Sequence, residues 1–236
     1  MKSKSLLLLS LVLAMLFQFA FAQEAPSARD EMIDAILEVA YEVYDGANGR
    51  PKRAQYASDI YICKNFTVHA FREVAEDFCM EEFPDTPLVI PNNLPRDECA
   101  PNRYGYAWEE ISPEDGNPFY VAASFLYDKN LSKSENVALA REFLQQVQKG
   151  DYFQMAANYY YGVGAHSMIF IEDYLQSEDS VFWTDSNMKG KKINGERYAY
   201  VQYNAKKKID WFVDAFCKKG YGATIYRLRD DISAKN

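Results

Sequence analysis

A change in hydrophobic periodicity along the chain is the feature that most constrains its fold. Apolar side chains first recur at helical spacing, beginning after a capping box at Ser27 and Asp30. Alternating segments dominate after Gly150-Asp151. The predicted helices cover about 27–44, 63–78, 135–148 and 206–218, and the predicted strands lie near 152–157, 166–172, 180–185, 197–203 and 223–228. Helices followed by an antiparallel sheet are typical of the α+β class, which is the predicted fold class.

The first 22 residues have the pattern of an export signal. Lys2 and Lys4 precede an apolar run from Leu6 to Phe21, and Ala20-Phe21-Ala22 supplies a small-x-small cleavage pattern. No later stretch approaches the ~20 apolar residues that a transmembrane helix needs. We therefore expect a signal peptide at 1–22 and one secreted or periplasmic domain at 23–236, with no integral membrane span after cleavage. A retained N-terminal anchor is the alternative.

Charge and motif content exclude several classes of function. The formal net charge is −8, and the main basic cluster, Lys206-Lys207-Lys208, is expected to be the solvated start of a helix. Nucleic acid is therefore not an expected partner. The chain has two histidines and no Cys or carboxylate at metal-ligand spacing beside them, and it has no Gly-rich phosphate loop. We expect no metal and no cofactor.

Residues 82–118 hold most of the nine prolines and are predicted to form an irregular insertion. Its aromatic residues either anchor the loop to the body or stack on a sugar or peptide; they are Tyr104, Tyr106 and Trp108. Cys79 and Cys99 are candidates for a disulfide in an exported protein. Cys217, in an apolar helical segment, is expected to be a buried free thiol.

Cys63 and His166 are the candidate reactive pair. Cys63 begins an amphipathic helix, His166 begins a strand, and His69 falls on the polar side of the Cys63 helix. A thiol becomes a strong nucleophile when it is ionised. A helix N-terminus stabilises an anion by about 0.3–1 kcal/mol, which is less than one pKa unit, so His166 must supply most of the shift. The alternative for Cys63 is one half of a disulfide.

The strands at 166–172 and 180–185 are expected to pair as a hairpin. If Phe170 lies opposite Val181, His166 faces Asp185, and a two-residue slip places it opposite Asn187 instead. Side chains alternate along a strand, so both lie on the face of His166 and either can orient its ring. The backbone N–H of Cys63 is the natural first donor of an oxyanion hole, with Gln55 or Tyr56 as candidates for the second.

The order of these features resembles the papain-like cell-wall hydrolases of the NlpC and CHAP families. In those families an opening helix and a Gly-rich turn precede a cysteine at a helix start, and a Gly-Asp pair precedes the strand before the histidine. The matching residues here are Ile33–Tyr44, Asp45-Gly46, Cys63, Gly150-Asp151 and His166. CHAP-type members also place an acidic residue and an Asn, two apart, on the strand after the histidine strand, and Asp185-Ser186-Asn187 matches.

The chain departs from the family pattern in three respects. Ile62-Cys63-Lys64 stands where Asp-Cys-Ser is usual, the third residue is not a histidine, and the Pro-rich insertion is additional.

The resemblance implies a papain-like core and an exported cysteine hydrolase that cleaves an amide or peptide bond, for example in peptidoglycan stem peptides. Cys63 would be the nucleophile, His166 the base, and Asp185 or Asn187 the residue that orients the histidine. Two alternatives stay open. One is an inactive secreted module of the same fold that binds a wall or peptide ligand, and the other is a thiol acyltransferase or transamidase with the same residues.

Overall fold

The computed structural model describes residues 25–47, 53–55, 60–61, 63–90, 112–156, 166–188, 192–196 and 198–235. The segment 1–22, Tyr56, Cys99 and the three insertion aromatics lie outside the described residues. The helices and strands are, in order, α2 (Ala28–Gly46), β1 (Arg53–Gln55), α3 (Cys63–Ala75), β2 (Phe78–Met80), the 3-10 turn η2 (Pro113–Asp115), β3 (Phe119–Leu126), α4 (Lys133–Leu144), β4 (Tyr152–Ala156), β5 (His166–Phe170), β6 (Ser180–Met188), β7 (Tyr198–Lys208), α5 (Ile209–Lys219), β8 (Gly222–Leu228) and β9 (Ile232–Ala234).

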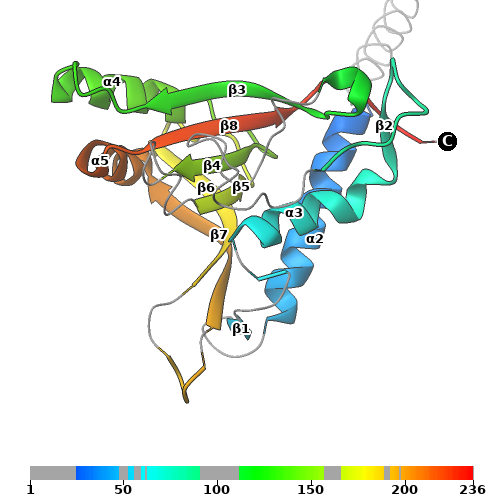
Figure 1. Cartoon of the computed structure of the whole chain (residues 1–236), viewed down its shortest axis with the longest axis horizontal. Coiled ribbons are helices and arrows are strands. Elements are labelled where there is room, and N and C mark those ends of the chain that lie inside the picture. Colours follow the sequence, from blue (N-terminus) through cyan, green and yellow to red (C-terminus); the bar gives the residue numbers. More distant parts are fainter. Residues whose placement is uncertain are drawn as a thin grey trace, which may run out of the picture.

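A seven-stranded antiparallel sheet forms the centre of the structure. Its strand order is β1-β7-β6-β5-β4-β8-β3, and every neighbouring pair is antiparallel. Strands β2 and β9 form a separate antiparallel ribbon. Figure 1 shows α2 and α3 on one side of the strands and α4 and α5 on the other. The α+β class predicted from the sequence is confirmed.

Two apolar cores lie on opposite faces of the sheet. One is built around α2 and α3 and includes Ile169 of β5. The other is built around α4 and α5 and includes Met168 and Phe170 of the same strand. Both faces of β5 are therefore covered, which explains why its second half, Met168-Ile169-Phe170, is continuously apolar instead of alternating with polar residues.

The entry to β4 is fixed by a buried ion pair and a close backbone approach. The Asp151 carboxylate is fully buried and accepts two 2.8 Å hydrogen bonds from the Arg227 guanidinium and one from the Gln148 backbone N–H. Gly150, beside it, has φ +84°, and a Cβ there would lie 2.6 Å from the Ile33 side chain of α2. The Gly150-Asp151 pair therefore fixes where the sheet begins after α4.

The four predicted helices are present, but their bounds differ: α3 ends at Ala75, so that Phe78 lies in β2 and not in the helix, and α4 covers 133–144 instead of 135–148. A reciprocal capping box joins Ser27 and Asp30 at the start of α2, and a second one joins Ser132 and Glu135 at the start of α4. Such boxes satisfy backbone donors that a helix N-terminus otherwise leaves without partners.

Two segment predictions need correction. Lys206–Lys208 do not begin a helix, because they are the last residues of β7 and pair with Phe182, Val181 and Ser180 of β6; α5 begins only at Ile209. The Lys206 ammonium also lies 4.9 Å from the centre of the Phe182 ring, which favours the extended position. Residues 119–126, for which no strand is predicted above, form the edge strand β3.

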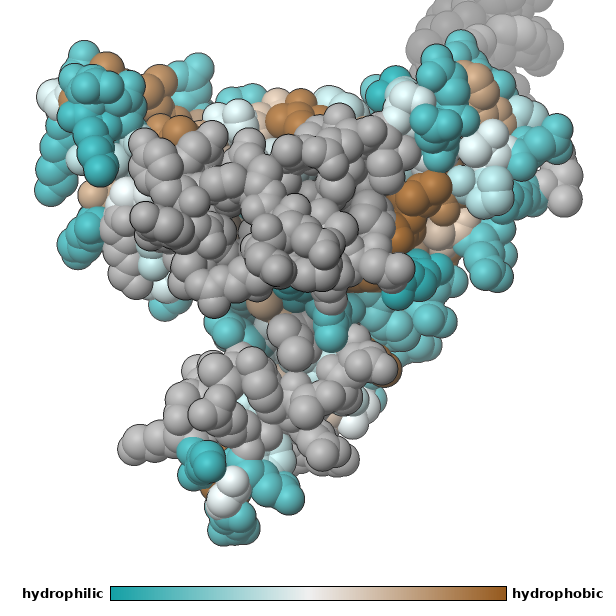
Figure 2. Space-filling model, in the orientation of Figure 1, coloured by the Kyte–Doolittle hydropathy of each residue, from teal (hydrophilic) through white to brown (hydrophobic). Residues whose placement is uncertain are grey.

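The described surface is mostly hydrophilic. Figure 2 shows hydrophilic residues over most of the visible described surface and small apolar patches, one of them along β3. The exposed apolar side chains of that strand are Tyr120, Val121 and Leu126. Among the described residues, none of the helices combines the length and the apolar character that a bilayer crossing requires.

Replacing Gly150 by Ala should destabilise the fold more than the same change at Gly195. Both glycines have φ +84°, so both variants carry left-handed strain of roughly 1–2 kcal/mol. Only Gly150 is close to a neighbouring side chain, which adds about 1–3 kcal/mol of overpacking. Urea unfolding of the two variants measures the difference, and equal losses would show that the contact with Ile33 contributes nothing.

Candidate active site

Helix α3 brings Cys63 to the sheet. Its apolar stripe is buried and packs across β5 and β6, and Phe66, Ala70 and Phe71 have no exposed surface. Figure 1 shows α3 running up to these strands. Within the helix, the buried Thr67 hydroxyl bonds the carbonyl of Cys63 at 3.3 Å and that of Lys64 at 2.9 Å. Cys63 is half-buried at the helix start, as predicted.

The ladder between β5 and β6 ends before the site. It pairs Phe170 with Trp183 and Ile169 with Thr184, so the register with Phe170 opposite Val181 is wrong and the two-residue slip is present. Beyond Ile169 these two described strands are no longer paired. Strand β7 contains one extra residue here, between the partners of Trp183 and Asp185, and its Asn204 has φ +57°. Such a bulge bends and twists a strand pair, and we attribute the separation of β6 from β5 to it.

The start of α3 contacts both separated strands. The backbone N–H of Ser167 in β5 donates to the Cys63 sulfur. The Ser186 hydroxyl in β6 donates to the carbonyl of Tyr61 at 2.7 Å. Cys63 is therefore hydrogen-bonded to β5, and Tyr61, two residues before it, is hydrogen-bonded to β6.

A chain of hydrogen bonds runs from Cys63 through His166 to Asp185. The His166 Nε2 atom lies 2.7 Å from Asp185 Oδ2, and the two side chains are 13% and 5% exposed. Because Nε2 is engaged by Asp185, the bond between the ring and the Cys63 thiol falls to Nδ1. Asp185 Oδ1 accepts a 2.9 Å bond from Gln202 Nε2, so both carboxylate oxygens have a partner.

The electrostatics favour a thiolate–imidazolium pair. Burial by itself raises the pKa of the Cys63 thiol, but the hydrogen bond and charge of His166 and the N–H groups of Ser167 and Lys64 lower it below its ordinary value of 9.0. Burial by itself lowers the pKa of His166, yet Asp185 and Cys63 raise it from 6.5 to about 10. The thiol is therefore more readily ionised than an ordinary cysteine, and at neutral pH the ring holds a transferable proton.

Of the two predicted orienting residues, the structure brings only Asp185 to the histidine. Asn187 is exposed and lies opposite Tyr200 in the β6–β7 ladder. Among the predicted oxyanion donors, the Cys63 backbone N–H is at the helix start, Gln55 pairs with Tyr198 in β1, and Tyr56 lies outside the described residues.

Three further residues of the site were not predicted from the sequence: Ser167, Ser186 and Gln202. Each acts through a backbone N–H, a hydroxyl or an amide whose partner depends on the strand register, and no local pattern marks such a residue.

A buried cluster of hydrogen bonds also holds the start of β5. The Ser167 hydroxyl donates to Gln154 Oε1 of β4 at 2.8 Å, and the Tyr152 hydroxyl donates to the same oxygen.

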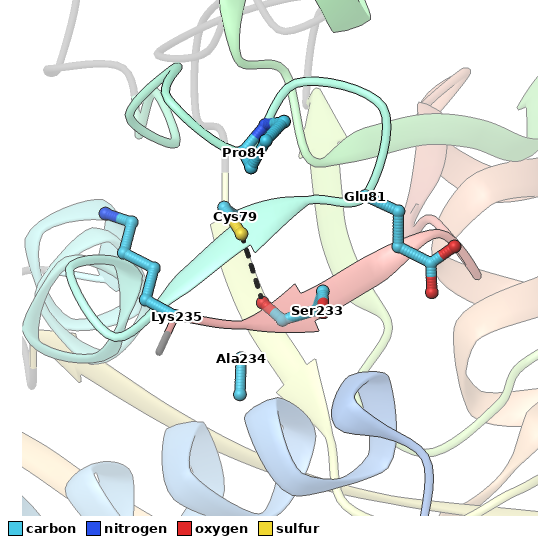
Figure 3. A pocket seen from close by; sticks show the side chains of 6 residues that line it. All are labelled: Cys79, Glu81, Pro84, Ser233, Ala234 and Lys235. Carbon is cyan, nitrogen blue, oxygen red and sulfur yellow. Dashed lines mark hydrogen bonds between the residues drawn. The ribbon is translucent and has the colours of Figure 1, made fainter.

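The other described thiols are separate from this site. Cys79 is free and buried, contrary to the bridge considered above, and Cys99 lies outside the described residues. The Cys79 thiol donates to the Ser233 carbonyl at 3.7 Å beside a cavity of about 530 Å³ (Figure 3). The cavity is lined by residues that come after the C-terminal end of α3, whereas Cys63 is the first residue of that helix. No histidine is among its described lining residues. Cys217 is free and half-buried, and burial raises its pKa.

The second histidine, His69, is not part of the site. The His69 ring lies 3.3 Å from the Glu73 carboxylate one turn along α3, away from the Cys63 thiol. Within the part of the chain that the structure describes, no group of three or more His, Cys, Asp or Glu residues is placed to hold a metal ion.

Comparison with protein-family models, with curated proteins and with solved structures finds no match to this chain. The geometry of Cys63, His166 and Asp185 is therefore the basis for assigning a function.

Asp185→Asn should lower the pKa of His166, whereas Asn187→Ala should leave it unchanged. Removing an adjacent carboxylate lowers the pKa of a cationic ring by about 1 to 3. The chain has only two histidines, so imidazole NMR signals can be assigned with one His69 variant, and His69 serves as the internal reference. An Asn187→Ala variant that lowers the pKa as much as Asp185→Asn would contradict this assignment.

Proposed function

We propose that this protein is an exported cysteine hydrolase with a papain-like core of the NlpC/CHAP type. It cleaves an amide or peptide bond in a peptide or peptidoglycan-like substrate. The observation that carries the proposal is the hydrogen-bonded chain of Cys63, His166 and Asp185, in which a nucleophile, a base and an orienting carboxylate come from three different elements. A cysteine at a helix start, packed on an antiparallel sheet that presents the histidine, also supports the papain-like core.

The first half of the reaction forms a thioester. The Cys63 thiolate attacks the substrate carbonyl carbon, and the carbonyl oxygen becomes an oxyanion that backbone N–H groups at the start of α3 are suited to stabilise. The His166 imidazolium gives its proton to the departing amine nitrogen as the C–N bond breaks. The amine product leaves, and the acyl group stays on Cys63.

The second half restores the enzyme by hydrolysis. Neutral His166 takes a proton from a water molecule, and the oxygen of that water attacks the thioester carbonyl. The C–S bond breaks, the carboxylic acid product leaves, and the thiolate–imidazolium pair forms again. Asp185 holds the ring by its Nε2 atom throughout, so that Nδ1 stays directed at the thiol.

Residues 23–236 should cleave at least one member of a panel of peptidoglycan preparations and stem peptides, releasing a new amine detected by mass spectrometry. Cys63→Ala should abolish product, and His166→Ala should lower kcat by about 10²–10⁴, which is the usual contribution of a general base. Asn187→Ala, on an exposed site, is the matched control and should keep full activity. Added amine acceptors separate hydrolysis from acyl transfer.

The proposal is contradicted if the Cys63 thiol has no part in any cleavage. If the wild-type and Cys63→Ala proteins both leave every substrate intact and bind the insoluble wall equally well, the protein is a binding module and not a hydrolase.

The pH dependence of kcat/KM should be bell-shaped, with an alkaline limb near 10. Activity needs a deprotonated thiol and a protonated ring, so it rises through the lowered pKa of Cys63 and falls through the pKa of about 10 at His166. Asp185→Asn removes one of the two groups that raise the pKa of His166, the other being Cys63, and the alkaline limb should move to lower pH. An unchanged alkaline limb in that variant would show that Asp185 does not set the proton affinity of the ring.

A further inference from the structure

Ser186 ties the central sheet to the chain that enters α3. It is fully buried, follows Asp185 in β6, and donates to the Tyr61 carbonyl at 2.7 Å across a sequence separation of 125 residues. Tyr61 is two residues before Cys63, so the distance from the held carbonyl to the nucleophile is limited to the reach of two residues, about 7 Å.

The Ser186 bond is a direct hydrogen bond from β6 to the chain that enters α3. The Thr67 hydroxyl bonds the carbonyls of Cys63 and Lys64, which lie in the same helix. The His166 ring and the Ser167 N–H approach the thiol from β5. The Ser186 bond differs from these contacts because it comes from β6, from the residue next to Asp185, beyond the point where β5 and β6 cease to pair.

We propose that Ser186 is a positioning residue that holds the entry to α3 on β6, so that the Cys63 thiol lies between the His166 ring and the Ser167 N–H. This inference rests on the proposed function of the same site. Alignment of this kind is demanding, because a displacement of about 1 Å can cost roughly 100-fold in rate.

Ser186→Ala and Ser180→Ala make a matched pair for the test. Ser180 lies at the other end of β6, is 2% exposed, and donates to a loop carbonyl, that of Glu178, at 3.0 Å. Each variant loses one buried hydroxyl-to-carbonyl bond from the same strand. Comparable losses of Tm are therefore expected, and only Ser186→Ala should change the thiol.

The readout is the apparent pKa of Cys63, from alkylation by iodoacetamide against pH followed by peptide mass spectrometry. Ser186→Ala should raise this pKa by about one, which moves the curve of alkylation rate against pH by about one pH unit and lowers the rate by roughly tenfold at pH values below the pKa. Ser180→Ala should leave both at the wild-type values. A second pair, Ser186→Thr and Ser186→Val, keeps the shape and differs only in the hydroxyl, so Thr should stay closer to wild type than Val.

Two results would overturn the proposal: a wild-type pKa in Ser186→Ala and Ser186→Val, or an equal rise in Ser180→Ala. Both results differ from the one expected if the proposed function is wrong. If the proposed function is wrong, the wild-type Cys63 thiol has an ordinary pKa that does not depend on His166. A low wild-type pKa that depends on His166 and not on Ser186 removes the positioning role alone.

Discussion

The bond between His166 and Asp185 is the interaction on which the site depends. It joins two neighbouring strands beyond the end of their ladder, and it places the ring between a carboxylate and a thiolate in a mostly buried position. Buried charges cost several kcal/mol each to desolvate, so this arrangement is stable only when every charge has its partner. Removing one partner from such a pair typically costs about 3–5 kcal/mol. The site and the local fold are therefore coupled.

Contacts elsewhere in the structure hold the strands and the helix that carry Cys63, His166 and Asp185 in position. The buried Asp151–Arg227 pair and the approach of Gly150 to Ile33 fix the start of β4. β4 in turn holds the start of β5 through the bonds of Gln154 with Ser167, the residue after His166. On the other side, β7 has its bulge where β5 and β6 cease to pair, and the start of α3 contacts both of these strands. Each support acts on backbone position and not on the reacting groups themselves.

Local signals allowed much of this to be predicted from the sequence. The capping box at Ser27 and the apolar stripes located α2, α3 and α4, although not their exact ends, because those signals involve residues three or four apart. Alternation along β6 limited the orienting residue to Asp185 or Asn187. The choice between them depends on the bulge at Asn204 and the separation of two strands, which no local pattern reveals.

The errors have physical causes as well. The three lysines of β7 have the composition of a solvated helix start, and only their pairing with β6 shows that they are extended. β3 is an edge strand with small, half-exposed residues in its middle, so the alternation of apolar and polar residues along it is weak. Its partner β8 also lies about 100 residues further along the chain, so no local signal indicates their pairing.

The central claim, that Cys63 and His166 form a thiolate–imidazolium pair, can be tested without knowing the substrate. The measurement is the rate of Cys63 alkylation by iodoacetamide against pH in the wild-type protein and in His166→Ala. The paired thiol should titrate below its ordinary value of 9.0 in the wild type, and its pKa should rise in the variant. An ordinary wild-type pKa, or a low one that is unchanged when His166 is removed, would contradict the account.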